Sequence, residues 1–295
     1  MASGYKSIGV FIAFNFSEKL ENNISAPTIR VVSWNVARFR EWRRNNNQGS
    51  QLRLKMLQQL KAQNADVLCL QEFFYSSDKK FYSNIEEIQA MGYPYFYFSY
   101  DSNKQKQYVG SVIFSRFPIV DTGIVRYFRP ATPEALIYAD IKIKNDTVRI
   151  FTTHLQSVQF RKKEYKAISE IANADDSLFA NSKTILSKLK KAIVLRSAQA
   201  EVVRKISDDS PYPKIVCGDF NDVPNSNTYY NIRGAMQDAF LEKGFGIGRT
   251  FSGLSPTLRI DYIFADQSFS VKQFHRVVNK YSDHYQLLTD LQLNK

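Results

Sequence analysis

Cysteine is scarce in this sequence: Cys69 and Cys217 are the only two among 295 residues. Each lies in a short apolar run, so we expect two buried thiols with a structural role. Two cysteines cannot make a disulfide framework, and their spacing matches no cysteine-based metal site. The sequence therefore excludes a small disulfide-stabilised protein and gives no reason to require an oxidising compartment.

Long apolar runs are also missing. No stretch of about 18 apolar residues occurs, so the sequence predicts no membrane-spanning helix. The apolar segment Ile8–Phe16 is too short to span a bilayer. Because the chain starts abruptly in this segment, we expect residues 1–27 to be the remnant of a removed membrane anchor. The alternative is a strand that packs on the domain.

Acidic residues are the minority charge, with 28 Asp and Glu against 40 Lys and Arg, for a formal net charge of +12. The positive electrostatic potential of such a chain attracts nucleic acid, phosphorylated small molecules or an acidic membrane surface. The same charge can also have no role other than keeping the protein soluble. Hydrophobic residues make up 44% of the chain and charged residues 23%, which are ordinary values for a globular protein. The composition therefore narrows the class of partner without selecting one.

Strand-like and helix-like segments alternate from residue 28 to the end, without a linker or an internal repeat. This alternation predicts one α/β domain over residues 28–295. The expected strands cover Thr28–Trp34, Asp66–Leu70, Tyr93–Tyr100, Val109–Phe114, Ala135–Ile143, Thr147–Thr153, Lys214–Cys217, Ile260–Ala265, Val271–Val278 and Leu287–Leu293. The expected helical segments are Leu52–Gln63, Phe81–Met91 and the Lys-rich Ser157–Ser207, in which Phe160–Ser182 is typical of an insertion or cap.

Four predicted strands end in polar groups of similar chemistry. These are Asn35, Glu72, His154 and Asp219, the last followed closely by Asn221. Strand ends are where α/β sheets hold ligands. Carboxylates and carboxamides are the ligands of hard, oxygen-preferring cations, and such a cation neutralises the charge of a phosphate. With histidines available for proton transfer, the set indicates phosphate ester chemistry.

Six short motifs together resemble one known family. They are Ser33-Trp34-Asn35, Leu70-Gln71-Glu72, Thr153-His154-Leu155, Gly218-Asp219-Phe220-Asn221, Asp261-Tyr262-Ile263 and Ser282-Asp283-His284-Tyr285. In this order they resemble the endonuclease/exonuclease/phosphatase superfamily, which includes DNase I. The resemblance implies a four-layer α/β/β/α sandwich of two mixed β-sheets flanked by helices. It also implies a monomeric, metal-dependent phosphoesterase that uses Mg²⁺, with Mn²⁺ as a substitute.

The resemblance assigns the metal and the substrate to particular residues. Glu72 is the expected metal ligand, Asn35 lies beside it and orients the metal or a phosphate oxygen, and Asp283 is a second ligand or supports one. Arg38, which follows Asn35 in a polar loop, is a candidate contact for the substrate phosphate because guanidinium groups bind phosphate well.

The resemblance also assigns the proton-transfer groups. Asp219 orients or deprotonates the attacking water and Asn221 holds the scissile phosphate. His284 is the expected acid or base, with Asp261 oriented on its ring. His154 is expected to donate to the scissile phosphate. The carboxylate that partners His154 stays open between two candidates, Asp101 and Glu134.

Three functions remain to be separated. The first is a phosphodiesterase, in particular a nuclease, which the positive charge and the aromatic strands favour. The second is a phosphatase or phospholipase C-like enzyme that acts on lipid or inositol phosphates at a membrane surface, which the apolar N-terminal segment favours; the protein would then be membrane-associated. The third, a binding module that has lost its chemistry, is disfavoured because all six motifs are intact.

Overall fold

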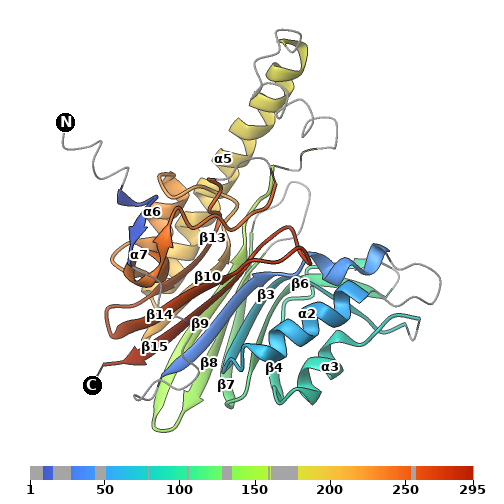
Figure 1. The fold of residues 1–295 in the computed structure, drawn as a ribbon, viewed down its shortest axis with the longest axis vertical. Helices are drawn as coiled ribbons and strands as arrows, with labels where there is room; N and C mark the ends of the chain where they lie inside the picture. Colours follow the sequence, from blue (N-terminus) through green and yellow to red (C-terminus); the bar gives the residue numbers. More distant parts are fainter. Residues whose placement is uncertain are drawn as a thin grey trace.

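Two β-sheets packed face to face form the centre of the molecule, and helices cover their outer faces (Figure 1). This computed structural model describes residues 9–15, 28–43, 51–78, 80–104, 106–127, 135–158, 160, 179–253 and 257–294. The four layers and the mixed strand directions confirm the fold class predicted from the sequence.

One sheet has seven strands and contains the first two sequence motifs at its centre. Its order is β14 (Phe269–Val277), β15 (Gln286–Leu293), β2 (Ile29–Asn35), β3 (Val67–Ser76), β6 (Gln107–Ser115) and β4 (Tyr95–Phe98), with β5 (Ser102–Lys104) also paired to β6. Strands β2 and β3 run parallel and are buried along nearly their whole length, which explains their Val- and Leu-rich composition.

The other sheet has six strands and contains the third, fourth and fifth motifs. Its order is β11 (Gln237–Asp238), β13 (Asp261–Ala265), β10 (Lys214–Asp219), β9 (Asp146–His154), β8 (Ala135–Ile143) and β7 (Ile119–Arg126). Strands β8 and β9 form the hairpin predicted around residues 144–146. Strand β7 was not predicted.

The main core lies between the two sheets. Val31 and Val67 from the seven-stranded sheet belong to the same buried cluster as Ile150 and Ile215 from the six-stranded sheet. Each fully buried aliphatic side chain of this kind contributes about 1.5–3 kcal/mol to folding. The cluster also contains both cysteines as free, buried thiols, in agreement with their predicted structural role.

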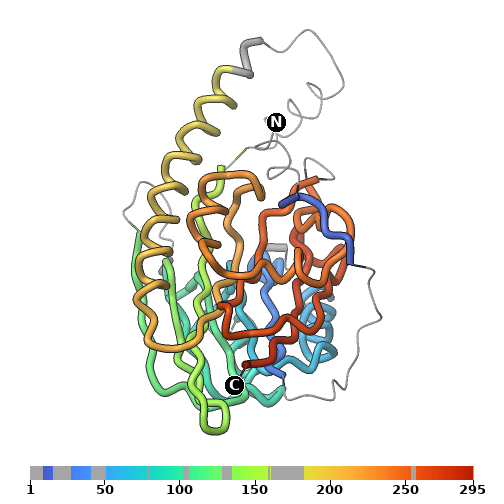
Figure 2. The backbone as a smooth tube through the Cα atoms, turned by 90° about the vertical axis from the view of Figure 1, so that its left-hand side faces the viewer, coloured from blue at the N-terminus to red at the C-terminus, as the bar shows by residue number. Residues whose placement is uncertain are grey.

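Helices close the outer faces through two further apolar clusters. Helices α2 (Gln51–Ala62) and α3 (Asn84–Ala90) pack on the seven-stranded sheet, whereas α5 (Phe179–Asp208) and α6 (Asn227–Arg233) pack on the six-stranded sheet (Figures 1 and 2). The short helix α7 (Ala239–Lys243) contacts β13 and β14. None of the helices in the described ranges is both long and apolar enough to cross a membrane.

One expected helical segment differs from the structure. Residues 157–158 are not helical, and the long helix begins at Phe179; residues 161–178 of the expected cap lie outside the described part of the chain. In α5 the buried face uses Ala192 and Val203, whereas Ile193 is 50% exposed.

Part of the N-terminal segment packs on the domain. Strand β1 (Ala13–Phe14) pairs with β12 (Phe245–Gly246), and the carbonyl of the buried Val10 accepts a hydrogen bond of 2.6 Å from Arg259. Ala13 and Phe14 therefore form a short strand that packs on the domain, whereas the residues before it are in a turn. The removed anchor stays a prediction.

Candidate functional site

Strand register places three predicted site residues in a row at the ends of three adjacent strands of the six-stranded sheet. In the parallel pair β9 and β10, His154 is opposite Asp219, and in the antiparallel pair β10 and β13, Asp219 is opposite Asp261. The strands are buried and their pairing is continuous, so the three side chains have little freedom to separate.

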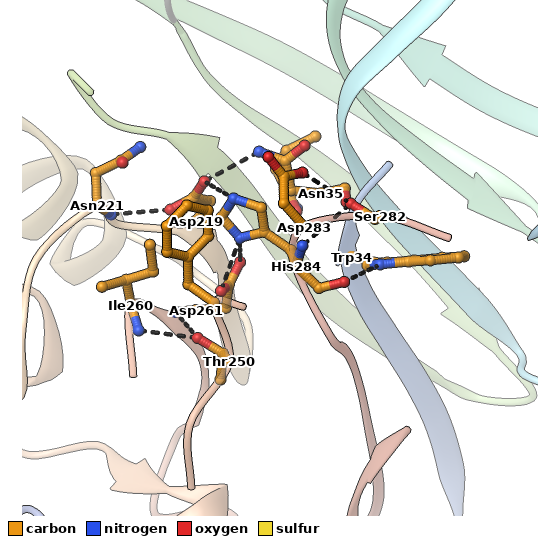
Figure 3. A network of polar contacts seen from close by, with 12 residues as sticks. Trp34, Asn35, Asp219, Asn221, Thr250, Ile260, Asp261, Ser282, Asp283 and His284 are labelled. Atoms are coloured by element: carbon orange, nitrogen blue, oxygen red, sulfur yellow. Dashed lines mark hydrogen bonds and ion pairs between the residues drawn. The ribbon is translucent and has the colours of Figure 1, made fainter. Parts of the chain in front are cut away.

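His284 completes this row from the segment that leads into β15 of the other sheet (Figure 3). Its Nδ1 atom lies 3.0 and 3.1 Å from the two carboxylate oxygens of Asp261, and its Nε2 atom lies 3.5 Å from Asp219 Oδ2. Its backbone carbonyl accepts a hydrogen bond of 3.0 Å from Trp34 Nε1. Thr250 Oγ1 accepts hydrogen bonds from the backbone N–H groups of Ile260 and Asp261. The imidazole is therefore fixed between two carboxylates.

The flanking carboxylates decide the charge of this histidine. Burial alone would lower the pKa of His284, but attraction to Asp261 and Asp219 outweighs it and raises the pKa to about 10. Burial raises the pKa of Asp261 to about 6, against the attraction of His284. Between these values the pair is an imidazolium and a carboxylate, so His284 is a cation at neutral pH.

Asn35 connects the two sheets. Its Nδ2 atom donates to Asp219 Oδ2 at 3.0 Å and to Glu72 Oε1 at 3.3 Å, while its Oδ1 atom accepts from the backbone N–H of Ala37 at 3.0 Å. Glu72, Asp219 and His284 thus belong to one connected set of contacts, as the predicted site requires. In this orientation the amide of Asn35 positions the two carboxylates.

Glu72 is presented by an irregularity of its strand. The register of β3 against β6 shifts between Leu70 and Phe73, and Glu72 has a φ of 47°, which identifies a β-bulge. Such bulges redirect a side chain that regular alternation would place elsewhere. The Glu72 side chain is 29% exposed and lies 3.7 Å from the guanidinium of Arg38.

His154 approaches Asp219 from the opposite side. Its Nε2 atom lies 3.5 Å from Asp219 Oδ2, the same oxygen that faces His284. Burial raises the pKa of Asp101, and hydrogen bonding to Ser99 together with attraction to Arg126 and His154 acts against this rise. Asp101 is therefore close enough to His154 to attract it, whereas Glu134, the other predicted partner, lies outside the described residues.

The loop after β10 depends on a glycine. A Cβ atom on Gly218, whose φ is +142°, would lie 2.0 Å from the carbonyl oxygen of Thr153 in the neighbouring strand. Asn221 has a φ of 53°; its backbone N–H donates to Asp219 Oδ1 at 2.9 Å and its side chain donates to Leu155 O at 3.0 Å. These contacts hold Asn221 directly beside Asp219.

A left-handed turn after β2 brings two arginines to the site. Residues 37–40 all have positive φ values, within the 3₁₀ element η1 (Ala37–Arg43). Arg40 contacts Asp283 Oδ1 at 3.3 Å, and the side chain of Arg40 is only 14% exposed. Nothing in the neighbouring residues signals the turn that covers most of the Arg40 side chain. Thr250, which supports Asp261, was also missed because it lies in a loop outside the motifs.

The site offers two sets of donors for a cation. Oxygen and nitrogen atoms of Asp219, Asp261 and His284 lie within 4.8 Å of one another. Both ring nitrogens of His284, however, already face carboxylates, and a protonated imidazole has no lone pair for a metal. The partly exposed carboxylate of Glu72, with Asp219 joined to it through Asn35, is the oxygen-rich set that suits a hard cation.

Comparison with known proteins identifies relatives of this site and fold. Protein angel homolog 1 of Homo sapiens is 25% identical over 181 residues, which cover 61% of this chain and 25% of that protein. The chain thus spans about a quarter of the length of the curated relatives it matches.

Two solved structures share the fold. The human Nocturnin catalytic domain with bound sulfate anion is 20% identical, with a TM-score of 0.63 over 91% of this chain and 96% of that one. D. rerio TDP2 complexed with single strand DNA product is 16% identical, with a TM-score of 0.58 over 90% of this chain and 99% of that one.

One sequence family matches almost the whole domain. The profile of the Endonuclease/Exonuclease/phosphatase family covers residues 32–284, from the second strand to the buried histidine of the site. The match includes five of the six motifs in full and the sixth as far as His284, and thus all the residues that the structure brings together. This chain therefore belongs to the Endonuclease/Exonuclease/phosphatase family, a family of hydrolases with phosphoesterase and nuclease-type activities.

Proposed function

We propose that this chain is a divalent-metal-dependent phosphodiesterase that hydrolyses nucleic acid. The proposal rests on the contacts of one oxygen atom, Asp219 Oδ2. It lies 3.0 Å from Asn35 Nδ2, which also contacts Glu72, and 3.5 Å from a nitrogen of both His154 and His284. Asp219 therefore connects the carboxylate of Glu72, through Asn35, with the imidazoles of His154 and His284.

The metal, in this proposal, is held by Glu72. Asp283, whose side chain is 44% exposed, supplies or supports a second oxygen, and Asn35 orients Glu72; the direct ligation by Asn35 predicted from the sequence stays a prediction. Carboxylate oxygens fit Mg²⁺, and Mn²⁺ accepts the same donors. When bound, the ion neutralises the phosphate charge and polarises the phosphorus centre.

The remaining polar groups supply proton transfer and charge stabilisation. Asp219 is held by Asn221 and Asn35, so that its carboxylate orients and deprotonates a water molecule. The His284 cation, fixed by Asp261, stabilises the negative charge that develops on the phosphate. His154 donates a hydrogen bond to a phosphate oxygen, and Asn221 and Arg38 hold other oxygens of the same group.

The substrate class rests on charge and on the relatives. A formal net charge of +12 favours a polyanion. The D. rerio TDP2 structure contains a single strand DNA product, which supports a nucleic acid substrate for this chain. A lipid or inositol phosphate at a membrane surface is the competing substrate class from the sequence, and the experiment below includes it.

The test is hydrolysis of a substrate panel by the purified chain. The panel contains plasmid, single-stranded DNA, RNA, sphingomyelin and inositol phosphates, each with Mg²⁺ and each with EDTA. We expect cleavage of a nucleic acid with Mg²⁺ and none with EDTA. Cleavage of the lipid or inositol phosphates alone would reject the nuclease assignment, and full activity in EDTA would reject the metal.

A matched pair of variants locates the metal. Glu72→Gln removes the charge of the proposed ligand and should reduce turnover by orders of magnitude, while the melting temperature stays close to that of the wild type. Glu201→Gln makes the same chemical change at an exposed position of α5 and should have no effect. Equal activity of the two variants would remove Glu72 from the mechanism.

A further inference from the structure

An exposed aromatic group lies at one end of strand β4 in the seven-stranded sheet. Tyr100 is 43% exposed, and its ring centroid lies 4.3 Å from that of Phe98 and 5.3 Å from that of Tyr108. Tyr75 stacks on Tyr108 at 5.9 Å. We call Tyr75, Tyr100 and Tyr108 the tyrosine platform; Tyr100 meets the other two rings at 88° and thus stands perpendicular to both.

The backbone under this platform is strained. Tyr100 has a φ of 50°, a left-handed conformation that is unfavourable for an L-residue with a bulky side chain. A bulky residue persists there only when its surroundings enforce the conformation, and such positions concentrate at ligand-binding sites. Because the strained side chain is 43% exposed, the strain does not serve burial of its ring in the core.

The platform is tied to the candidate active site through the next residue. Asp101 accepts a hydrogen bond of 2.6 Å from Ser99, and it attracts His154. A Cβ atom on Gly110 would lie 2.2 Å from Ser99 Oγ, so a glycine at this position of β6 leaves room for the pair. Tyr75 follows Glu72 by three residues in β3, which brings the platform to the site from a second strand.

A cation lies beside the platform. Arg126, at the end of β7, donates to Asp101 Oδ1 at 2.7 Å and to the carbonyl of Ser99 at 2.7 Å, yet its side chain is 49% exposed. The guanidinium is therefore held in place by the residues on either side of Tyr100 and still faces solvent. Arg126 is an oriented cation and Tyr100 an exposed ring, and both adjoin Asp101, which attracts His154. Such a cation and ring match the alternation of phosphate and base in a nucleotide chain.

From this arrangement we infer that Tyr100 and Arg126 form a nucleotide subsite. Tyr100 stacks on a base, and Arg126 contacts the phosphate next to the one that is cleaved. The inference rests on the proposed function, which it deepens by naming a single-stranded nucleic acid as the ligand. A lipid chain would need only an apolar surface, whereas a base needs the flat face of an aromatic ring.

The experiment compares binding of a short thymidine oligonucleotide with binding of a base-free oligonucleotide of the same length. Fluorescence anisotropy is measured in EDTA, where the proposed function predicts no cleavage. Tyr100→Leu keeps an apolar side chain but removes the ring, and should weaken binding of the thymidine oligonucleotide about 5-fold to 150-fold. Binding of the base-free oligonucleotide should stay unchanged, and Tyr100→Phe should bind both as the wild type does.

Two further variants control the result. Tyr95→Leu makes the same change at the far end of β4, where the ring is 39% exposed, and should have no effect. Arg126→Gln should weaken binding of both oligonucleotides. It should also reduce the slope of log affinity against log salt concentration by about one, because one phosphate contact is lost. A melting curve for each variant verifies that it is folded.

The inference is overturned if Tyr100→Leu weakens binding of both oligonucleotides equally, or of neither. It is also overturned if the same variant loses affinity for anionic phospholipid vesicles while its DNA binding is intact. Hydrolysis of methyl p-nitrophenyl phosphate, which has no base, separates the two failures. If Tyr100→Leu gives either of these binding results but hydrolyses this ester with Mg²⁺ as fast as the wild type does, the subsite alone is refuted. If the wild type hydrolyses no phosphodiester, the proposed function is refuted.

Discussion

Replacing Asp261 with asparagine tests the electrostatics of the site without changing its shape. The carboxylate lies 3.0 Å from His284 Nδ1, which places the two charge centres about 4 Å apart. At an effective dielectric constant of about 20 this attraction is worth about 4 kcal/mol, equivalent to about three pH units in the pKa of the histidine. The pKa of His284 should therefore fall from about 10 to about 7.

The assay is an NMR titration of protein with isotope-labelled histidine, in EDTA. The chain contains only three histidines, so the signals of His154, His275 and His284 can be assigned with one variant each. Burial lowers the pKa of His275 below its ordinary 6.5, so its titration is separated from that of His284. A wild-type His284 that titrates near 6.5, or an Asp261→Asn variant that leaves the midpoint at about 10, would refute the reasoning.

The pH dependence of the free energy of unfolding tests the same electrostatics in a second way. A histidine whose pKa is raised in the folded state stabilises the protein fully below its unfolded pKa near 6.5, and this contribution disappears as the pH rises to about 10. Asp261 acts in a lower window: its raised pKa favours folding at low pH, and that gain is lost between about 4 and 6. The wild-type free energy of unfolding should thus fall from pH 6.5 to 10, and less so in Asp261→Asn.

Three other predictions concern the scaffold. Gly218→Ala should lower the melting temperature and abolish hydrolysis because its Cβ clashes with Thr153 O, whereas Gly92→Ala, with φ +95° and open space around it, should only lower stability by strain. Asp238→Asn should reduce the free energy of unfolding in urea by about 3–5 kcal/mol because it leaves the buried Arg259 cation without its partner at 2.7 Å. Both cysteine thiols should react with Ellman's reagent only in denaturant, and rapid reaction of either thiol in the native protein would contradict its burial.

The sequence predicted the strands that hold the site because those strands are buried and apolar. β2 has Val and Ile and β10 has Ile, Val and Cys at buried positions, and each ends at a polar residue, Asn35 or Asp219. Parallel pairing aligns Asn35 with the end of β3 and Asp219 with His154. Face-to-face packing of the two sheets then brings Asn35 to Asp219. Strand β7 escaped prediction because half-exposed residues and Gly123 weaken its pattern.

The parts that the sequence did not predict depend on backbone conformations with no local signal. The left-handed turn at residues 37–40 contains neither glycine nor asparagine, so nothing indicated that the Arg40 side chain would be mostly covered and in contact with Asp283. The bulge that presents Glu72 is likewise enforced by the neighbouring strand. The partner of His154 stays open between Asp101 and Glu134, because spacing alone does not give the position of residue 101 relative to β9, and Glu134 lies outside the described residues.

Binding of Mn²⁺ to the resting protein tests the central claim most directly. Electron paramagnetic resonance counts free Mn²⁺ during a titration, so it reports the site without any substrate or turnover. We predict that the wild type and Glu201→Gln bind Mn²⁺ alike and that Glu72→Gln loses most of this binding. Equal binding by Glu72→Gln and the wild type would contradict the account, because the cation would then be held elsewhere.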